Sequence, residues 1–205
     1  MSDPSLRQSP LATLHLGSRT AHPAPDAEVH LVEKCAVGKI NLRADPANAA
    51  LMQALTGALG YELPREPNRT NGEGDHGALW LGPDEWLVTG PAGREKALFK
   101  ALSLAVSGHH AALSDVSDAR IVFTLSGPLA CAVLEKGCSL DLHPRAFQTG
   151  HCAQTRLARA AILLHRTGDT PAFDIHVAWS FAAYLWVWLE DAAAEFSLAV
   201  GGGDG

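Results

Sequence analysis

Short apolar segments separated by turn sequences constrain the fold of this chain more than any other feature. Residues 78–81 and 86–88 flank the turn sequence GPDE at 82–85, which predicts a tight hairpin. Residues 112–116 and 121–125 also flank a polar turn. Because hairpins join antiparallel strands, this pattern does not fit a doubly wound parallel sheet. It predicts an α+β fold with helices on antiparallel or mixed sheets.

Further strands and four helices follow from the pattern of apolar residues and the turn residues beside them. The additional strands are predicted at 29–42, 152–157, 160–165 and 173–177. The segment 64–75 is predicted to be a loop, because it is polar and rich in turn residues. The helices are predicted from Asp45-Pro46 to Gly60, over 92–106, from Ser126-Gly127-Pro128 to Glu135 with Ser126 as its cap, and from the cap Ser180 to about Phe196.

The length of 205 residues and a hydrophobic content of 47% allow a sizeable core without disulfides or a structural metal. Residues 1–26 contain prolines and no helical periodicity, and we expect an extended N-terminal arm there. Residues 27–199 are predicted to form one α+β domain of two packed lobes, about 27–110 and 111–199. The glycine-rich segment 200–205 is expected to be a flexible tail.

Charge and hydropathy exclude several classes of partner. Lys and Arg number 16 against 22 Asp and Glu, and no basic run is present, so nucleic acid is not an expected partner. No apolar stretch reaches the roughly 18 to 20 residues that cross a membrane. The first ten residues, which are polar, lack the basic-then-apolar order of a secretory signal, and we expect a cytoplasmic protein.

No metal site is predicted from the cysteines and histidines. The nearest approach to a ligand cluster is Cys138, His143, His151 and Cys152, but no C-x-x-C or H-E-x-x-H spacing anchors it. In the absence of an export signal, we expect reduced thiols packed as small hydrophobic groups. The cysteines are Cys35, Cys131, Cys138 and Cys152.

No catalytic or cofactor-binding residue is predicted either. A nucleophilic site would need Cys138 or Ser126 to meet His143 and Asp141, and sequence spacing cannot establish such a meeting. The triple glycine at 201–203 follows no predicted strand and precedes no helix, so it is not a phosphate-binding loop. Any nucleotide cofactor is therefore expected to be held elsewhere.

Aromatic residues gather near the C-terminal helix, at Trp179, Phe181, Tyr184, Trp186 and Trp188. Trp186 and Trp188 stand two residues apart, so a helix directs them to different faces. Two alternatives follow. Either the helix lies in a thick core, or one of its faces contacts another protein through aromatic anchors.

Six segments in order resemble the family of gamma subunits of heterotetrameric sarcosine oxidase, over about residues 81–189. No single segment is diagnostic, but their order is distinctive. The segments are LGPDEWL at 81–87, DVSDAR at 115–120, LSGP at 125–128, KGCSLDLHPRAF at 136–147, GHCAQT at 150–155 and SFAAYLWVWL at 180–189.

This resemblance implies an α+β fold of two ferredoxin-like lobes, similar to the folate-binding domain of the glycine-cleavage aminomethyltransferase. It also implies alpha, beta and delta subunits as partners. Such a complex oxidatively demethylates sarcosine to glycine, forms hydrogen peroxide and transfers a one-carbon unit to tetrahydrofolate. The resemblance assigns FAD, FMN, NAD, tetrahydrofolate and zinc to the other subunits and no cofactor to this chain. A non-catalytic structural subunit is therefore expected.

Two rival functions remain at this stage. One is a stand-alone folate-binding protein similar to the aminomethyltransferases. Against it, the chain is short for those enzymes, which carry an additional barrel domain. The other is a folate-binding factor of iron–sulfur assembly, suggested by Lys136-Gly137-Cys138. The glycine–glutamine–glutamate continuation typical of those factors is missing here.

Overall fold

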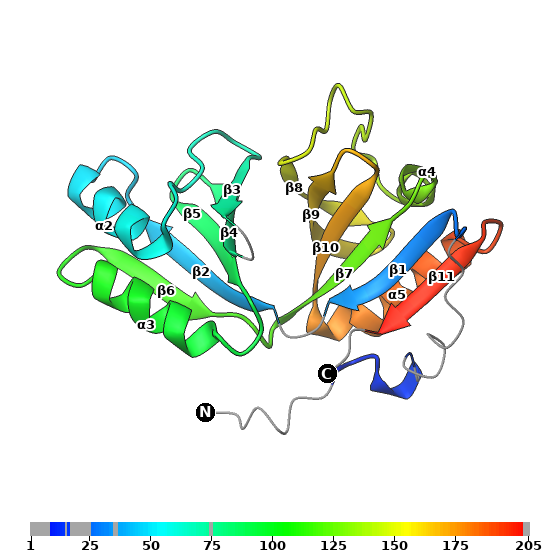
Figure 1. Ribbon diagram of the computed structural model, residues 1–205, viewed down its shortest axis with the longest axis horizontal. Coiled ribbons are helices and arrows are strands. Elements are labelled where there is room, and N and C mark those ends of the chain that lie inside the picture. The colour runs from blue at the N-terminus through cyan, green and yellow to red at the C-terminus, as the bar shows by residue number, and fades with distance from the viewer. Residues whose placement is uncertain (1–8, 15, 17–25, 35–36, 74–75, 203–205) are drawn as a thin grey trace.

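The computed structural model describes residues 9–14, 16, 26–34, 37–73 and 76–202. The chain forms two lobes side by side, each with a β-sheet whose outer face is covered by helices (Figure 1). The two sheets face each other, so the layers run helix, sheet, sheet, helix. This arrangement confirms the predicted α+β class with antiparallel and mixed sheets.

The first lobe contains a five-stranded antiparallel sheet in the order β3-β4-β5-β2-β6. Two helices, α2 (Ala49–Leu59) and α3 (Glu95–Ala105), pack on it through Leu51, Leu55 and Leu102. The strands are β2 (Gly38–Ala44), β3 (Thr70–Glu73), β4 (His76–Gly82), β5 (Glu85–Gly90) and β6 (Ala111–Asp115).

The second lobe contains a six-stranded sheet in the order β11-β1-β7-β10-β9-β8, in which β1 and β11 pair in parallel and the other pairs are antiparallel. Helices α4 (Ala130–Glu135) and α5 (Ala182–Ala192) cover its outer face, and the short segments η2 (Ala12–Leu14) and η3 (Trp179–Phe181) are 3-10 helices. The strands are β1 (Val29–Lys34), β7 (Arg120–Ser126), β8 (Cys152–Leu157), β9 (Ala160–Gly168), β10 (Ala172–Ala178) and β11 (Leu198–Gly202).

The division into lobes differs from the predicted boundary between 27–110 and 111–199. Strand β1 belongs to the six-stranded sheet and β6 to the five-stranded sheet, so the first lobe is a continuous insertion between β1 and β7. The polar turn after β6 is therefore not a hairpin but a crossing between lobes, visible at the base of the molecule (Figure 1). Ser117 fixes this crossing, because its Oγ accepts from the Lys39 backbone N–H at 2.9 Å and donates to Asp115 Oδ1 at 2.6 Å.

Both chain ends contribute more to the fold than the sequence indicated. In the predicted arm, Leu11 and Leu16 are buried in the apolar core of the second lobe. In the predicted tail, Gly201 and Gly202 belong to β11 and pair with β1. Backbone pairing needs no side chain, so a glycine-rich strand leaves little signal in the sequence. The rest of these segments, 1–8, 15, 17–25 and 203–205, lies outside the described residues.

Three helices start at residues other than the predicted ones. Helix α2 begins at Ala49 rather than near Pro46, because the Asn48 side chain accepts from the Leu51 backbone N–H at 3.1 Å. Its predicted stop is confirmed, since Gly60 adopts a left-handed φ of 85°. Ser126 ends β7, and α4 begins after Leu129 without a side-chain cap. Ser180 lies within η3 and caps no helix.

Gly127 explains why the LSGP segment turns before α4 rather than starting it. Its φ of 115° is unfavourable for other residues, and a Cβ there would approach the Glu28 carbonyl oxygen to 2.4 Å. The chain must therefore pass tightly against the start of β1 before the helix can form. The predicted loop 64–75 contains the short strand β3, which pairs with β4.

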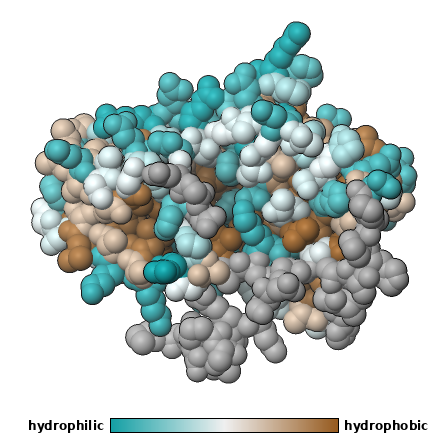
Figure 2. Space-filling view, viewed as in Figure 1, coloured by the Kyte–Doolittle hydropathy of each residue, from teal (hydrophilic) through white to brown (hydrophobic). Residues whose placement is uncertain are grey.

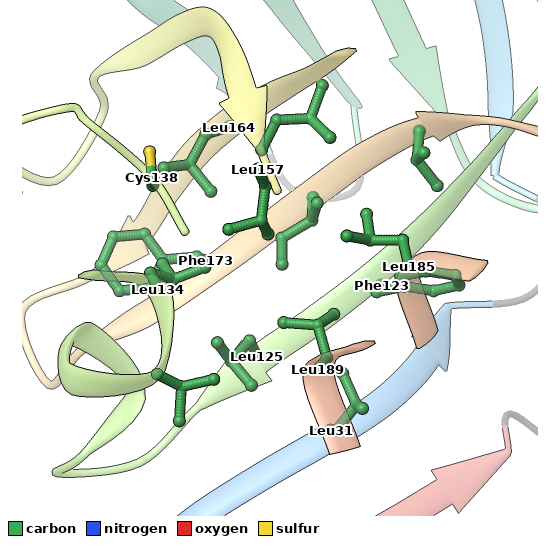
Figure 3. Packing of buried hydrophobic residues seen from close by; sticks show 14 of the residues in the cluster. Leu31, Phe123, Leu125, Leu134, Cys138, Leu157, Leu164, Phe173, Leu185 and Leu189 are labelled. Carbon is green, nitrogen blue, oxygen red and sulfur yellow. The ribbon is translucent and has the colours of Figure 1, made fainter. Parts of the chain in front are cut away.

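The larger core fills the space between the six-stranded sheet and its helices. Side chains from β1, β7, β10 and α5 converge there, including Leu31, Phe123 and Leu185 (Figure 3). Trp186 is fully buried and meets the Phe123 ring edge-on, with centroids 5.1 Å apart. A smaller cluster of Leu79, Leu87, Cys152 and Leu163 joins the two sheets. Apolar packing thus closes one part of the space between the sheets.

Candidate functional site

A polar cleft occupies another part of the space between the sheets, and strand β10 explains why it is polar. Successive residues of a strand point to opposite faces of the sheet. Phe173, Ile175 and Val177 lie in the apolar core beneath the helices. Asp174 and His176 lie on the opposite face and line the cleft. One strand therefore supplies both a core and a candidate site.

The cleft has a volume of about 450 Å³ and takes its lining from both lobes. This volume lies within the range of roughly 300–1,000 Å³ that is typical of small-molecule sites. The six-stranded sheet contributes polar side chains from β1, β9 and β10, and the five-stranded sheet contributes others from β3, β4 and β5. The polar side chains are Lys34, Thr70, Asn71, His76, Thr89, His165, Thr167, Asp174 and His176.

Asp174 is the buried charge of the cleft, with a side chain only 10% exposed. Its Oδ2 accepts from Lys34 Nζ at 2.9 Å, and its Oδ1 accepts from Thr124 Oγ1 at 2.8 Å. Burial alone would raise the pKa of Asp174, but the Lys34 charge and these two hydrogen bonds outweigh burial and lower the pKa. The carboxylate is therefore ionised and compensated by Lys34.

Two histidines beside Asp174 are neutral, and of these His176 is buried and His165 half-buried. Burial lowers the pKa of His176 to about 3, opposed by the Asp174 charge and reinforced by His165, Lys39 and Arg120. Burial also lowers the pKa of His165. His165 Nε2 lies 3.4 Å from Thr70 Oγ1. The Nδ1 atom of His176 is buried and has no hydrogen-bond partner among the described residues.

The residues singled out from the sequence do not form this cleft. Cys138 is buried with Sγ 4.0 Å from Thr155 Oγ1, and His143 lies in an exposed loop. Cys152 is buried between the sheets, where desolvation raises its pKa to about 12. Over the described part of the chain, no three His, Cys, Asp or Glu side chains are placed to bind a metal ion. Cys35 lies outside the described residues.

The residues that do line the cleft were missed by the sequence analysis. Lys34, Thr70, His165, Asp174 and His176 come from four strands that are distant in sequence. The available signal was the segment FDIHV at 173–177, in which polar residues alternate with apolar ones. Such alternation indicates a sheet with one polar face, but it does not reveal that a second sheet covers that face.

The lining of the cleft combines hydrogen-bonding and apolar groups. It offers hydrogen-bonding groups on two neutral imidazoles, two threonines of β3 and β5, and the Lys34–Asp174 pair. The lining also includes apolar side chains such as Leu79 and Val122.

An exposed aromatic surface lies apart from the cleft, around η3 and the start of α5. It is formed by Trp179, Phe181, Tyr184 and Val187, whose exposed fractions are 50%, 43%, 40% and 51%. Trp186, by contrast, is completely buried, and Trp188, which was predicted to lie on a different face, is partly buried and packs against the same core. In the space-filling view, hydrophobic residues elsewhere gather in small patches among hydrophilic ones (Figure 2). Among the described helices, none has the length and hydropathy of a membrane span.

The architecture is shared with a solved aminomethyltransferase. It matches half of the glycine cleavage system aminomethyltransferase T from Bartonella henselae, with a TM-score of 0.66 and 17% identity over 94% of this chain and 51% of that chain. This likeness defines the fold class, a two-lobed α+β domain of the aminomethyltransferase type.

Closer relatives then identify the family. The family described as "Sarcosine oxidase, gamma subunit family" matches residues 43–195. Sarcosine oxidase subunit gamma from an Arthrobacter species is 38% identical over 94% of this chain and 93% of its own length. A chain of heterotetrameric sarcosine oxidase from Corynebacterium sp. U-96 superimposes with a TM-score of 0.84 and 36% identity over 94% of this chain and 97% of that chain. The chain belongs to the sarcosine oxidase gamma subunit family.

Proposed function

We propose that this chain is the gamma subunit of a heterotetrameric sarcosine oxidase and that it has no catalytic activity by itself. One observation carries the proposal. The chain matches, over nearly its whole length, a chain of similar size within a solved heterotetrameric sarcosine oxidase. Near-complete coverage of both chains indicates an equivalent subunit rather than a shared fragment.

The partners in this proposal are alpha, beta and delta subunits in the cytoplasm. Together the complex would oxidise sarcosine to glycine, reduce oxygen to hydrogen peroxide and pass the one-carbon unit to tetrahydrofolate. FAD, FMN, NAD, tetrahydrofolate and zinc would be held by the partners.

The aromatic surface around η3 and α5 supports a role in assembly. Trp179, Phe181 and Val187 are among the most exposed large hydrophobic side chains of the described chain. Aromatic anchors of this kind are enriched where proteins associate. We therefore assign this surface to a contact with another subunit.

Co-purification from the native cell tests the assembly. The tagged chain should be recovered in a yellow complex with larger partners and with the visible absorption of bound flavin. A colourless, monomeric chain would contradict the proposal. The double variant Trp179→Ser/Phe181→Ser should reduce the recovered partners by about tenfold or more, as for loss of interface hot spots.

A matched control is Leu104→Ser, because Leu104 is 69% exposed on α3 in the other lobe. This variant should retain the partners. Equal loss of recovered partners in both variants would contradict the assignment of the aromatic surface to a subunit contact. It would not contradict the proposal that the chain is a subunit.

A second candidate function is a stand-alone folate-binding protein. It is favoured by the 27% identity to an aminomethyltransferase from Saccharopolyspora erythraea, over 92% of this chain and 53% of that protein. A folate titration of a colourless, monomeric preparation would test it, and saturable binding there would move this candidate ahead.

A further inference from the structure

Every Lys and Arg of this chain precedes the segment that forms the aromatic surface. All 16 of them lie between residues 7 and 166, whereas residues 167–205 contain six Asp and Glu. The first 166 residues therefore carry 16 charges of each sign, and the formal net charge of -6 comes entirely from residues 167–205. This segment includes β10, η3, α5 and β11. The exposed aromatic side chains thus lie in the acidic part of the sequence.

Asp191 carries negative charge at one end of the aromatic surface. Tyr184, Val187 and Asp191 are exposed and stand at i, i+3 and i+7, so they share one face of α5. Among the described residues, none forms an ion pair with Asp191. Asp191 also lies in the last turn of α5, where the helix dipole disfavours a negative charge. Its charge therefore does not stabilise the helix that carries it.

Asp118 carries negative charge at the other end of this surface. The Trp179 backbone N–H donates to the Ala119 carbonyl at 2.9 Å, which places the crossing between the lobes beside η3. Asp118 and Ala119 are both exposed. Arg120 follows them, but it lies on the cleft face of β7 with Val122, because residues two apart in a strand point the same way. The aromatic surface is therefore flanked by carboxylates at both ends.

We propose that the aromatic surface binds a segment of a partner subunit that combines apolar side chains with Arg or Lys. The apolar side chains pack on Trp179 and Val187. The basic side chains pair with the carboxylates of Asp118 and Asp191. Arginine suits these positions best, because its guanidinium pairs with a carboxylate and also stacks on a Trp or Tyr ring. This inference rests on the proposed function and specifies the chemistry of the partner at that contact.

Recovery of partner subunits with the tagged full-length chain, at about 0.1 M and about 1 M salt, tests the charge of the partner. The Debye length falls from about 10 Å to about 3 Å between these concentrations. Asp191→Lys should reduce the recovered partners by about tenfold or more at the lower salt concentration, since like charges across an interface repel. The difference from the unsubstituted chain should narrow at the higher salt concentration. Asp191→Asn, which only removes the charge, should give a smaller loss.

Glu62→Lys is the matched control, because Glu62 is an exposed acidic residue of the first lobe and the substitution changes the net charge equally. This variant should retain the partners. Circular dichroism should show that Asp191→Lys remains folded, since the helix dipole favours a cation in the last turn of α5. Equal recovery with both lysine variants, or higher recovery with Asp191→Lys, would overturn this inference and leave the subunit proposal intact. Absence of partners from the unsubstituted chain would overturn both.

Discussion

The two faces of the six-stranded sheet are both buried, yet they differ in chemistry. The face beneath α4 and α5 is filled by apolar side chains such as Phe123, Phe173 and Leu185 (Figure 3). The face toward the other sheet carries Asp174 and His176, held by specific polar contacts or left partly unsatisfied. Because the same strands form both faces, neighbouring residues of β10 lie alternately in the apolar core and in the lining of the polar cleft.

This difference indicates how stability and function are separated in the second lobe. Close packing on the apolar face stabilises the fold, and a cavity there would lower the free energy of unfolding. The polar face contributes less stability for the same burial, since its groups lose hydration on folding. Substitutions on the two faces should therefore change the free energy of unfolding by different amounts, and these changes should depend differently on pH.

The largest expected effect lies on the apolar face. Trp186→Ala removes a fully buried ring that packs edge-on against Phe123, and it should destabilise the chain by about 3–5 kcal/mol. Chemical denaturation followed by circular dichroism measures this loss. Trp179→Ala, on the exposed aromatic surface, is the control. Similar losses in both variants would contradict the contrast between core and surface.

The next effect is a pH dependence that originates on the polar face. An unfolded histidine has a pKa near 6.5, whereas burial lowers the pKa of His176 to about 3 in the folded chain. Between these values the unfolded chain binds more protons, so the free energy of unfolding falls as the pH decreases, by up to about 1.4 kcal/mol per pH unit. This stabilising contribution is fully present above pH 6.5.

Denaturation curves between pH 7 and 4.5 measure this slope. His176→Leu should make the slope shallower, and the remaining slope would come in part from His165, whose pKa is also lowered by burial. Leu104→Ser, at an exposed and non-titrating position on α3, should leave the slope unchanged. An unaltered slope in His176→Leu would mean that other groups cause the pH dependence of the free energy of unfolding.

A smaller effect is expected from the ion pair between the exposed Lys34 and the buried Asp174. Asp174→Ala leaves the Thr124 hydroxyl without its acceptor and Lys34 without its counter-ion, so it should cost about 1–3 kcal/mol at neutral pH. Asp169→Ala is the matched control, because Asp169 makes an exposed hydrogen bond with Thr149. Its cost should stay within about 0.5 kcal/mol. Equal losses of the free energy of unfolding in the two variants would mean that the ion pair does not stabilise the polar face.

The smallest effect on folding is expected at the aromatic surface. Trp179→Ser should change the free energy of unfolding of the isolated chain by no more than about 0.5 kcal/mol, because half of the side chain is already in contact with solvent. The same change should weaken association with partner subunits. A large loss of stability without any loss of association would assign Trp179 to the fold rather than to an interface.

Local structure was accessible from the sequence wherever the signal itself was local. The β4–β5 hairpin follows from the turn sequence at 82–85, and the end of α2 follows from Gly60. The start of α4 was misjudged, because the conformation of Gly127 is imposed by close approach to Glu28 rather than by its neighbours in sequence. Propensity thus failed where a tertiary contact determined the backbone.

The sequence by itself determined the α+β class, most of the strands and helices, and the family resemblance, because these depend on periodicity, turn residues and ordered motifs. Only the tertiary structure decided which sheet each strand joins. It alone separated β6 from β7 and brought Lys34 to within 2.9 Å of Asp174. Residues 140 positions apart in the chain leave no local pattern that records their contact, so the cleft exists only in the folded molecule.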